Sequence, residues 1–361
     1  MVFSDGENDA REINDEDDSM DPARWTISGV TVGELPLEMA REFRTNTKSI
    51  RAHRDLLVRL QIGETEGWGE GYTLELETAR SAIDPELLRG RDPWDMEDLL
   101  EPVEHLRARS ALDLALHDAL SRRLALPLHR FLGLPRPRPA TSASLSVGED
   151  DRAVIEEARA WVGRGFRHLK LKMATATDPS LPLRVRDAVG DAAAIRVDGN
   201  QAWSLEQALE IFPHLERAGV EFCEQPVAVG ESAVCAAIRR ETRVPIYLDE
   251  EVTGPADVAR VWRHGGVDGV NVKVTKCGGL RRSLETIRMA RRLGLRVMIG
   301  CYFESSLATA AAVHLTALAD AVDLDAPLFL AADPFTGLRY EDGRAVVGGT
   351  GIGVRPRTDA S

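Results

Sequence analysis

The chain has 361 residues, of which 43% are hydrophobic and 29% are charged, a balance typical of soluble globular proteins. Its formal net charge of −13 at pH 7 argues against nucleic acid or an anionic membrane surface as a partner. No apolar run approaches the roughly 18–20 residues that span a bilayer, so no membrane segment is predicted.

Residues 1–25 form an acidic leader that contains nine Asp or Glu side chains against two Arg. Such a segment cannot bury enough apolar surface to fold, so a disordered tail is predicted. It lacks the basic start and apolar stretch of a secretion signal, which favours a cytoplasmic location. The four cysteines have no zinc-type spacing and suit a reducing compartment.

Residues 26–135 are predicted to form an α+β unit. Alternating apolar and polar residues at 25–30 and 56–60 predict strands, and the sequence Gly-Trp-Gly-Glu-Gly at 67–71 predicts a tight turn or a strand end. A helix is predicted over residues 109–126, where leucines recur every four residues on one face. The proline-rich run at 134–139 indicates a boundary.

From residue 140 onward, short apolar runs alternate with helical patterns. Eight strands with interleaved helices favour a parallel (β/α) barrel of the TIM type over residues 136–334. A doubly wound open sheet is the alternative, but no glycine-rich turn follows the first strand. The predicted strands are 142–147, 168–173, 194–198, 220–224, 245–249, 270–273, 296–301 and 322–325, with helices such as 152–164, 205–218, 280–293 and 306–318.

Five consecutive strands of this barrel end in a chemically useful side chain. The five are Lys172, Asp198, Glu224, Asp249 and Lys273, at intervals of 24 to 26 residues, which is one βα unit each. In a barrel the carboxyl ends of the strands meet at one mouth, where active sites lie. A charged residue often marks only the exit of a strand from the core, but five in register make that explanation weak.

The residue types at this mouth indicate a chemistry. Three carboxylates without His or Cys suit Mg²⁺, which leaves positions for substrate. Lys172 precedes them by one strand and Lys273 follows them by one strand, so the two amines would face each other across the metal. Such a site suits removal of a proton α to a carboxylate through a metal-stabilised enediolate. Two opposed bases imply racemisation or epimerisation; one base with an electrostatic partner is the alternative.

Lysine is rare in this chain, because only five of its 45 basic side chains are lysine and the other 40 are arginine. Arginine stays protonated at any useful pH, whereas a lysine amine can act as a base. Alternation places Lys170 on the same inward side as Lys172, where its charge would lower the pKa of Lys172. Lys276 lies three residues beyond Lys273 and is assigned a supporting role.

These motifs resemble the enolase superfamily, specifically its muconate lactonizing enzyme subgroup. The resemblance implies a modified (β/α)7β barrel, an α+β capping domain completed by about residues 335–361, and Mg²⁺ as cofactor. A homo-oligomer is also expected. The matching stretches are Lys170-Leu171-Lys172, Asp198-Gly199-Asn200, Glu224-Gln225-Pro226, Asp249-Glu250, Asn271-Val272-Lys273, the 67–70 turn and the 111–115 helix.

Asp323 and Asp325, at the end of the last strand, are similar to the Asp-x-Asp pair with which dipeptide epimerases hold the N-terminal ammonium of the substrate. The resemblance therefore implies a Mg²⁺-dependent dipeptide epimerase that inverts the α-carbon of the C-terminal residue. A pair of loop-entry aspartates that caps the next segment is the alternative. o-Succinylbenzoate synthase, N-acylamino-acid racemase and muconate cycloisomerase share the lysine and metal set. A non-catalytic scaffold would not need that set.

Side-chain preference is expected to come from the capping loop near residues 43–53. Lys48 falls roughly where L-Ala-D/L-Glu epimerases place an arginine for the acidic side chain, and Arg51 is nearby. Either would favour Glu or Asp as the second residue, although a solvated loop charge explains them equally well. Tyr302 and Phe303, after the seventh strand, would instead line an apolar pocket.

Overall fold

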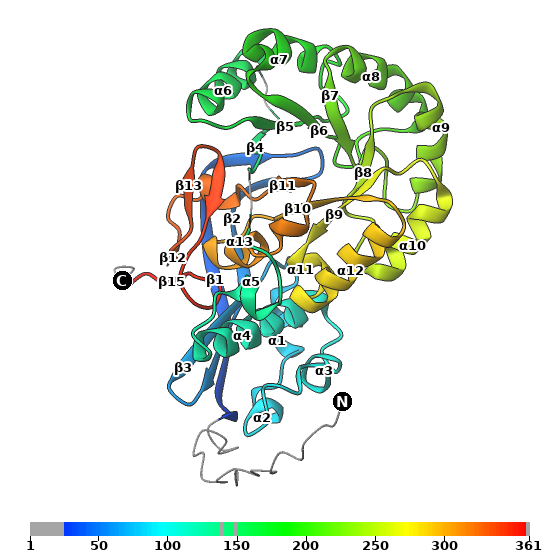
Figure 1. The fold of residues 1–361 in the computed structure, drawn as a ribbon. Helices are drawn as coiled ribbons and strands as arrows, with labels where there is room; N and C mark the ends of the chain where they lie inside the picture. The colour runs from blue at the N-terminus through cyan, green and yellow to red at the C-terminus, as the bar shows by residue number, and fades with distance from the viewer. Residues whose placement is uncertain (1–24, 138–139, 148–149, 359–361) are drawn as a thin grey trace, which may run out of the picture.

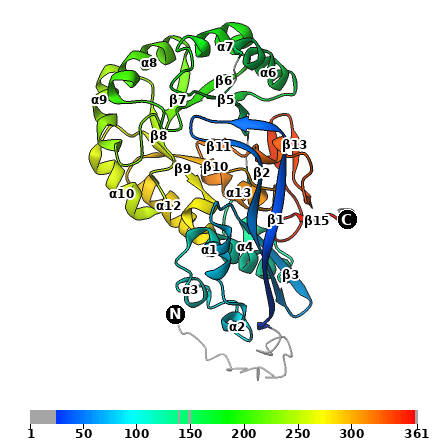
Figure 2. The same cartoon turned by 180° about the vertical axis from the view of Figure 1, so that it is seen from behind.

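The computed structural model describes residues 25–137, 140–147 and 150–358. The acidic leader predicted over residues 1–25 lies outside this part of the chain except for Trp25, whose ring packs 5.6 Å from that of Trp94. The described chain forms a helix-covered barrel with a smaller α+β unit beside it (Figure 1, and from behind in Figure 2). Among the described residues, no helix combines the length and apolar character needed to cross a membrane.

The barrel is an eight-stranded sheet whose strands follow chain order, and each pairing in it is parallel. The backbone N–H of Ser142 donates to the carbonyl of Val322 at 3.0 Å and brings the first strand beside the last. The fold is therefore α/β with a modified (β/α)7β barrel, as predicted. The strands are β4 (Ala143–Leu145), β5 (His168–Lys172), β6 (Ala194–Asp198), β7 (Val220–Glu224), β8 (Ile246–Leu248), β9 (Gly269–Lys273), β10 (Arg296–Gly300) and β11 (Ala321–Asp323).

Helices cover the outside of the barrel (Figure 1). Their ends follow local chemistry: the N-cap of α8 is Ser204, and its side chain and that of Gln207 form a reciprocal capping box. The helix predicted over 306–318 is wrong at its end, because α13 stops at Val313 and a short 3-10 turn follows. The barrel helices are α6 (Asp151–Gly163), α7 (Leu181–Val189), α8 (Leu205–Arg217), α9 (Cys235–Glu241), α10 (Pro255–His264), α11 (Val274–Cys277), α12 (Leu280–Arg292) and α13 (Ser306–Val313).

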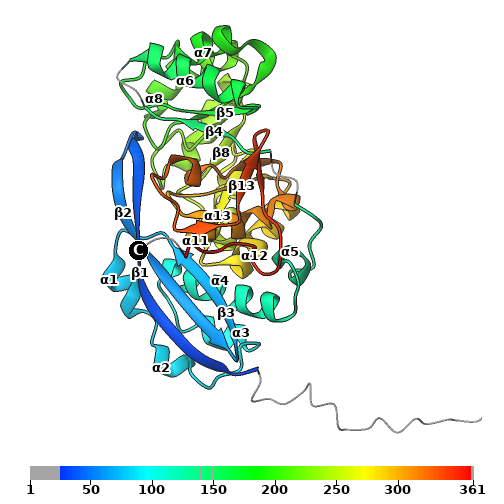
Figure 3. The same ribbon diagram turned by 90° about the vertical axis from the view of Figure 1, so that its left-hand side faces the viewer.

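The smaller unit contains a three-stranded antiparallel sheet in the order β1-β2-β3. Its first two strands are much longer than predicted, and Figure 3 shows their hairpin reaching from this unit to the barrel. At the tip, the backbone N–H of Val147 donates to the carbonyl of Arg44 at 3.0 Å. The elements are β1 (Ile27–Arg44), β2 (Ser49–Ile62), β3 (Thr65–Gly71), α1 (Leu76–Ser81), α2 (Pro85–Leu88), α3 (Met96–Leu100), α4 (Leu106–Arg123) and α5 (Leu128–Phe131).

Of the two predicted alternatives for the glycine-rich stretch at 67–71, the strand end is correct and the tight turn is wrong, because the stretch forms the last five residues of β3. A Cβ on Gly69 would lie 1.9 Å from the carbonyl oxygen of Ala111 in α4, and one on Gly67 would lie 2.2 Å from that of Ala115. The glycines thus let a strand pack directly on a helix backbone. Helix α4 is buried on nearly every side, whereas the leucine pattern predicted a single apolar face.

The end of the chain returns to the capping unit. The backbone N–H of Ile352 donates to Asp118 Oδ1 in α4 at 2.8 Å, and that of Leu128 donates to the Gly351 carbonyl at 2.8 Å. These contacts support the predicted completion of the capping domain by the C-terminal segment. That segment forms two short antiparallel pairs, β12 (Phe335–Thr336) with β15 (Arg355–Pro356) and β13 (Arg339–Glu341) with β14 (Arg344–Val346).

Candidate active site

The register of the barrel brings the predicted strand-end residues to one rim. Lys172 on β5 is paired with Asp198 on β6, and Asp198 is paired with Glu224 on β7. Asp249 directly follows β8, and Lys273 ends β9. The two lysines therefore lie at opposite ends of a row whose three middle members are carboxylates.

All three carboxylates are buried, and lysine amines lie between them. Lys172 Nζ is 2.6 Å from Asp198 Oδ2, and Lys273 Nζ is 2.6 Å from Asp249 Oδ2. Although burial opposes ionisation, Lys170 and Lys172 lower the pKa of Asp198 to about 2. Burial likewise opposes the ionisation of Asp249, yet Lys273 and Lys276 hold its pKa well below the usual value. Both acids are therefore kept as carboxylates.

Glu224 is the least compensated of the three acids. Burial, followed by the charge of Asp198, raises the pKa of Glu224 to about 7. Its Oε2 is buried, accepts no hydrogen bond from the described residues, and lies 2.7 Å from Lys170 Nζ. That amine is shared with Asp198 and Asp323, so the carboxyl lacks a cation of its own.

The chemistry of this donor set fits a divalent cation. Within the described ranges, no three His, Cys, Asp or Glu side chains already stand as a ready cluster of ligands, and amines separate the acids. Three buried carboxylates from adjacent strands nevertheless supply the hard oxygen atoms that Mg²⁺ prefers. Asp198, Glu224 and Asp249 are the residues that would hold it.

Lys170 is buried and makes three ion pairs, at 3.0 Å to Asp198, 2.7 Å to Glu224 and 2.8 Å to Asp323. Burial disfavours its charge, but these carboxylates raise the pKa of Lys170 well above its ordinary value. The amine therefore positions three acids. Its expected effect on the pKa of Lys172 stays a prediction, although both amines do contact the same Asp198 oxygen.

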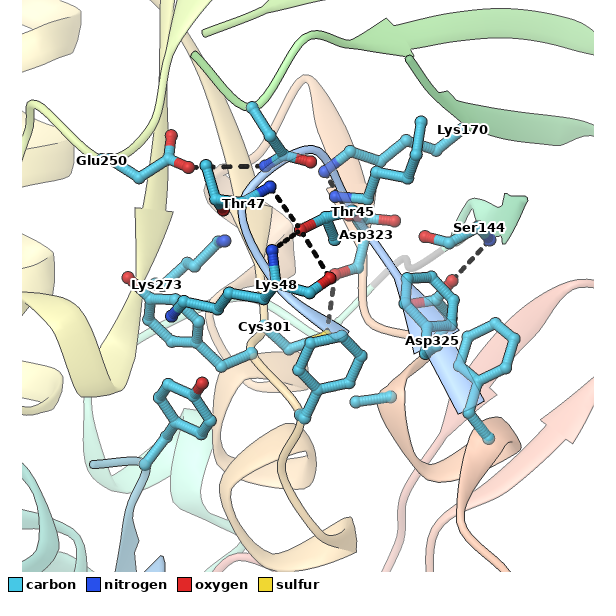
Figure 4. A pocket seen from close by; sticks show the side chains of 18 of the residues that line it. Thr45, Thr47, Lys48, Ser144, Lys170, Glu250, Lys273, Cys301, Asp323 and Asp325 are labelled. Atoms are coloured by element: carbon cyan, nitrogen blue, oxygen red, sulfur yellow. Dashed lines mark hydrogen bonds and ion pairs between the residues drawn. The ribbon is translucent and has the colours of Figure 1, made fainter. Parts of the chain in front are cut away.

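A pocket lies above this rim, and Figure 4 shows the tip residues Thr45, Thr47 and Lys48 over it. The side-chain amide of Asn46 donates to the carbonyl of Asn200 at 3.3 Å, which holds the hairpin against the barrel. Four of the five lysines line the pocket, and the fifth, Lys276, binds Asp249 Oδ1 at 2.6 Å. Every lysine of the chain therefore belongs to this site.

Asp323 and Asp325 line the pocket on the side away from Lys273 (Figure 4). Asp325 Oδ2 accepts a hydrogen bond from the backbone N–H of Ser144 at 2.6 Å. Asp323 Oδ2 accepts from Lys170 at 2.8 Å, while its buried Oδ1 accepts from none of the described residues. One carboxylate oxygen at this end of the pocket is thus available to a donor.

The structure brings two of the three remaining predicted residues to the pocket and leaves the third outside it. Tyr302 lines the pocket, and its ring lies 4.3 Å from Lys273 Nζ and stacks on Tyr72 at 4.6 Å. Lys48 also lines the pocket at its exposed mouth. Arg51 is exposed on β2 and is absent from the lining formed by the described residues, so the structure does not bring it to the site.

Sequence reasoning missed several lining residues. Tyr72 directly follows the glycine-rich stretch, and Glu250 belongs to the matched motif Asp249-Glu250, but neither was assigned to the site. Phe329 lies in a short 3-10 helix, Ala326–Phe329, and carried no signal. Asn200, which follows β6 and has a left-handed φ of 41°, also lines the pocket.

Comparison with known proteins identifies the class that this fold and site define. A family model described as Enolase C-terminal domain-like matches residues 153–360, more than half of the chain. The chain therefore belongs to the enolase superfamily. Within it, the chain falls in the muconate lactonizing enzyme subgroup and is an enzyme of the isomerase class.

Three relatives illustrate this membership. The hydrophobic dipeptide epimerase of Roseobacter litoralis is 36% identical over 65% of this chain and 69% of its own. Muconate cycloisomerase 1 of Rhodococcus opacus is 32% identical over 91% of this chain and 95% of its own. The dipeptide epimerase from Cytophaga hutchinsonii, solved with Mg and D-Ala-L-Val, is 26% identical with a TM-score of 0.87 over 93% of this chain and 97% of that one.

Proposed function

We propose that this enzyme is a Mg²⁺-dependent dipeptide epimerase that inverts the α-carbon of the C-terminal residue by proton transfer between two lysines. The observation that carries the proposal is the placement of Lys172 and Lys273 at the two ends of the carboxylate row. An α-carbon held between them would present its proton to one amine and its opposite face to the other. Removal on one side and return on the other inverts the centre.

The acids and the amines have separate tasks. Asp198, Glu224 and Asp249 would hold the Mg²⁺, which when bound supplies positive charge to the substrate carboxylate and makes the α-proton more acidic. Lys172 and Lys273 act in complementary protonation states, one as a free amine that accepts the proton and the other as an ammonium that donates one. Their roles exchange for the reverse reaction.

The acid pair at the far end supports a dipeptide over an N-acylated substrate. Asp323 Oδ1 is a buried acceptor without a donor among the described residues, and Asp325 lines the same end of the pocket. An ammonium group would satisfy that oxygen and balance its charge, whereas an acyl group would leave it unpaired. The dipeptide-epimerase relatives support the same choice.

A second candidate is a cycloisomerase-type reaction on an acid without an ammonium group, favoured by the 32% identity to muconate cycloisomerase 1. It would use the same acids and lysines and would leave Asp323 Oδ1 without a partner. Substrate type therefore distinguishes the candidates.

Solvent-deuterium incorporation tests the proposal. A library of L,L-dipeptides is incubated with the enzyme and Mg²⁺ in D₂O, and mass spectrometry reads one deuterium per molecule at the C-terminal residue. Absence of exchange in every dipeptide would refute the proposed function. A Lys172→Ala, Lys273→Ala double variant is the matched control, and exchange at the full rate there would refute the two-base mechanism.

Asp323→Asn and Asp325→Asn test the ammonium site. We expect each change to lower kcat/KM for dipeptides about tenfold or more, since a charge-assisted hydrogen bond is worth about 1.5–3 kcal/mol. N-acylated amino acids, if turned over, should be affected far less. Equal losses for both substrate types would remove the ammonium-site assignment while leaving the proton-transfer assignment intact.

A further inference from the structure

We propose that the pocket selects its dipeptide by the first residue, whose bulky apolar side chain packs against a wall formed by Phe43, Phe303 and Phe329. The inference rests on the proposed function, because it places the substrate ammonium at Asp323 and Asp325. It adds a specificity determinant that the proton-transfer chemistry does not require.

The wall is a packed aromatic cluster. The Phe43 ring lies 5.1 Å from that of Phe303 and 5.0 Å from that of Phe329, with interplanar angles of 64° and 63°. Such edge-to-face contacts are favourable between aromatic rings. Trp161 of α6 packs behind Phe329 at 6.0 Å. All three phenylalanines line the pocket, so one side of the cluster faces the substrate and the other is supported by the core.

The phenylalanine wall lies close to the acid pair because neighbouring residues in the sequence belong to both. Asp325 is the N-cap of the 3-10 helix Ala326–Phe329, so one turn carries both the acid and Phe329. Cys301 directly follows the neighbouring strand β10 and lies two residues before Phe303, and its thiol contacts the carbonyl of Asp323 at 3.2 Å. Cys301 and Ala326 are small and also line the pocket, which leaves space beside the acids.

An ammonium group held at the acid pair fixes the α-carbon of the first residue one bond away. The side chain on that carbon then lies next to the phenylalanine wall. The opposite side of the pocket carries charged groups, because Lys273, Glu250 and Lys48 gather there (Figure 4), and the rings of Tyr72 and Tyr302 stand beside Lys273. A first side chain next to the acid pair therefore meets a surface free of charged groups on the phenylalanine side.

The expected size of the effect follows from the area buried. Each buried CH₂ group is worth about a fourfold factor in binding, and Leu has three more carbons than Ala, so this replacement at the first residue should raise kcat/KM by about 10-fold for partial burial and about 60-fold for full burial. First residues with a charged side chain should be poor substrates, since the wall offers their charge no partner.

A dipeptide series with one constant second residue tests the wall. Deuterium incorporation is measured for X-L-Ala, where X is Gly, L-Ala, L-Leu, L-Phe, L-Arg or L-Glu. We expect kcat/KM to rise from Gly through Ala to Leu and Phe, and to be low for Arg and Glu. A flat series, or one in which Arg or Glu leads, would overturn the inference. Exchange in no dipeptide of the wider library would instead refute the proposed function.

Phe303→Ala provides the matched variant, because this side chain is only half-buried. The ratio of kcat/KM for L-Leu-L-Ala to that for L-Ala-L-Ala should fall at least fivefold, while Phe131→Ala in α5 should leave the ratio unchanged. The same two dipeptides are also titrated calorimetrically into the Lys172→Ala, Lys273→Ala enzyme with and without Phe303→Ala, which gives a second readout without turnover. If both measurements give an unchanged ratio in Phe303→Ala, the proposal that the phenylalanine wall selects the first residue is also overturned.

Discussion

Replacing one member of a buried acid pair in the capping unit should change how the stability of the protein depends on pH. Glu70 of β3 accepts hydrogen bonds from the backbone N–H of Ser305 at 2.8 Å, from its hydroxyl at 2.6 Å and from the N–H of Ala308 at 3.1 Å. It therefore joins the capping unit to the start of α13. Asp55 of β2 is fully buried beside it, and neither of its carboxylate oxygens accepts a hydrogen bond from the described residues.

The magnitude follows from the pKa of Glu70, which burial and then the charge of Asp55 raise from 4.5 to about 8. Below pH 4.5 both the folded and the unfolded chain hold this proton, so the full stability is present. As pH rises toward 8 the unfolded chain releases the proton while the folded chain retains it, and stability is lost. One pKa unit corresponds to about 1.4 kcal/mol, so the titration of Glu70 alone lowers the free energy of unfolding by roughly 3–4 kcal/mol between pH 5 and 8.

Asp55→Asn keeps the shape of the side chain, removes a second buried carboxyl whose pKa burial raises well above its ordinary value, and offers an N–H to Glu70. We expect the loss of unfolding free energy between pH 5 and 8 to shrink by at least about 1 kcal/mol. Other titratable groups around the pair are His53, whose Nε2 lies 3.5 Å from Asp55 Oδ1, and Glu304, whose pKa is raised to about 7, chiefly by burial. Neither is altered by the substitution.

The assay is chemical denaturation at pH 5, 6.5 and 8, followed by fluorescence of the tryptophans. Asp187→Asn on the exposed face of α7 makes the same chemical change away from the pair and serves as the control. If Asp55→Asn and Asp187→Asn lose the same stability between pH 5 and 8, the buried pair is not the source of the pH dependence and the reasoning is refuted.

Three further predictions concern the metal ligands, the capping sheet and the lysines. Glu224→Gln should weaken Mg²⁺ binding measured by calorimetry by at least about 100-fold with unchanged circular dichroism, and unaltered affinity would contradict its assignment. Gly69→Ala puts a Cβ 1.9 Å from a backbone oxygen and should cost about 3 kcal/mol, whereas Gly33→Ala meets nothing within 4 Å and should cost far less; equal costs would contradict this packing. Acetylation of the native enzyme should abolish exchange after few amines have reacted, because every lysine lies at the site. Bound dipeptide should slow the acetylation for the same reason. Full activity after acetylation of Lys48 and Lys172 would contradict this prediction.

The barrel could be predicted from sequence because its strands are buried on both faces. Strands β6 and β7 begin and end at the predicted residues, since each apolar run stops at a functional acid. The strands of the capping unit were harder to predict. Residues 27–44 form one strand although they include Gly33 and Pro36, because pairing with β2 and docking on the barrel override weak local propensity.

The candidate site could likewise be predicted only in part. The lysines and carboxylates could be placed because strand ends of a barrel converge whatever the loops do. Tyr72 could not, since it enters the pocket from the capping unit, and only the docking of that unit brings it to the rim. The loop near residues 43–53 was expected at the pocket, but the sequence did not indicate that Phe43 is one of its side chains that line it. The exposure of Arg51 has the same origin: alternation along β2 turns it outward, and sequence position near the loop could not reveal which way it faces.

The distribution of lysine and arginine can now be tied to geometry. Ion pairing alone does not explain lysine at this site, because arginine pairs with carboxylates through a two-pronged fork that is at least as strong. Lys170 meets three separate acids within 3.0 Å, which suits a compact ammonium with three donors and not a planar guanidinium. Lys172 and Lys273 each have one close acid, a contact that arginine could also make. What arginine could not do there is release a proton, so lysine at these two positions is what the proposed proton transfer needs, whereas lysine at position 170 fits the arrangement of the three acids.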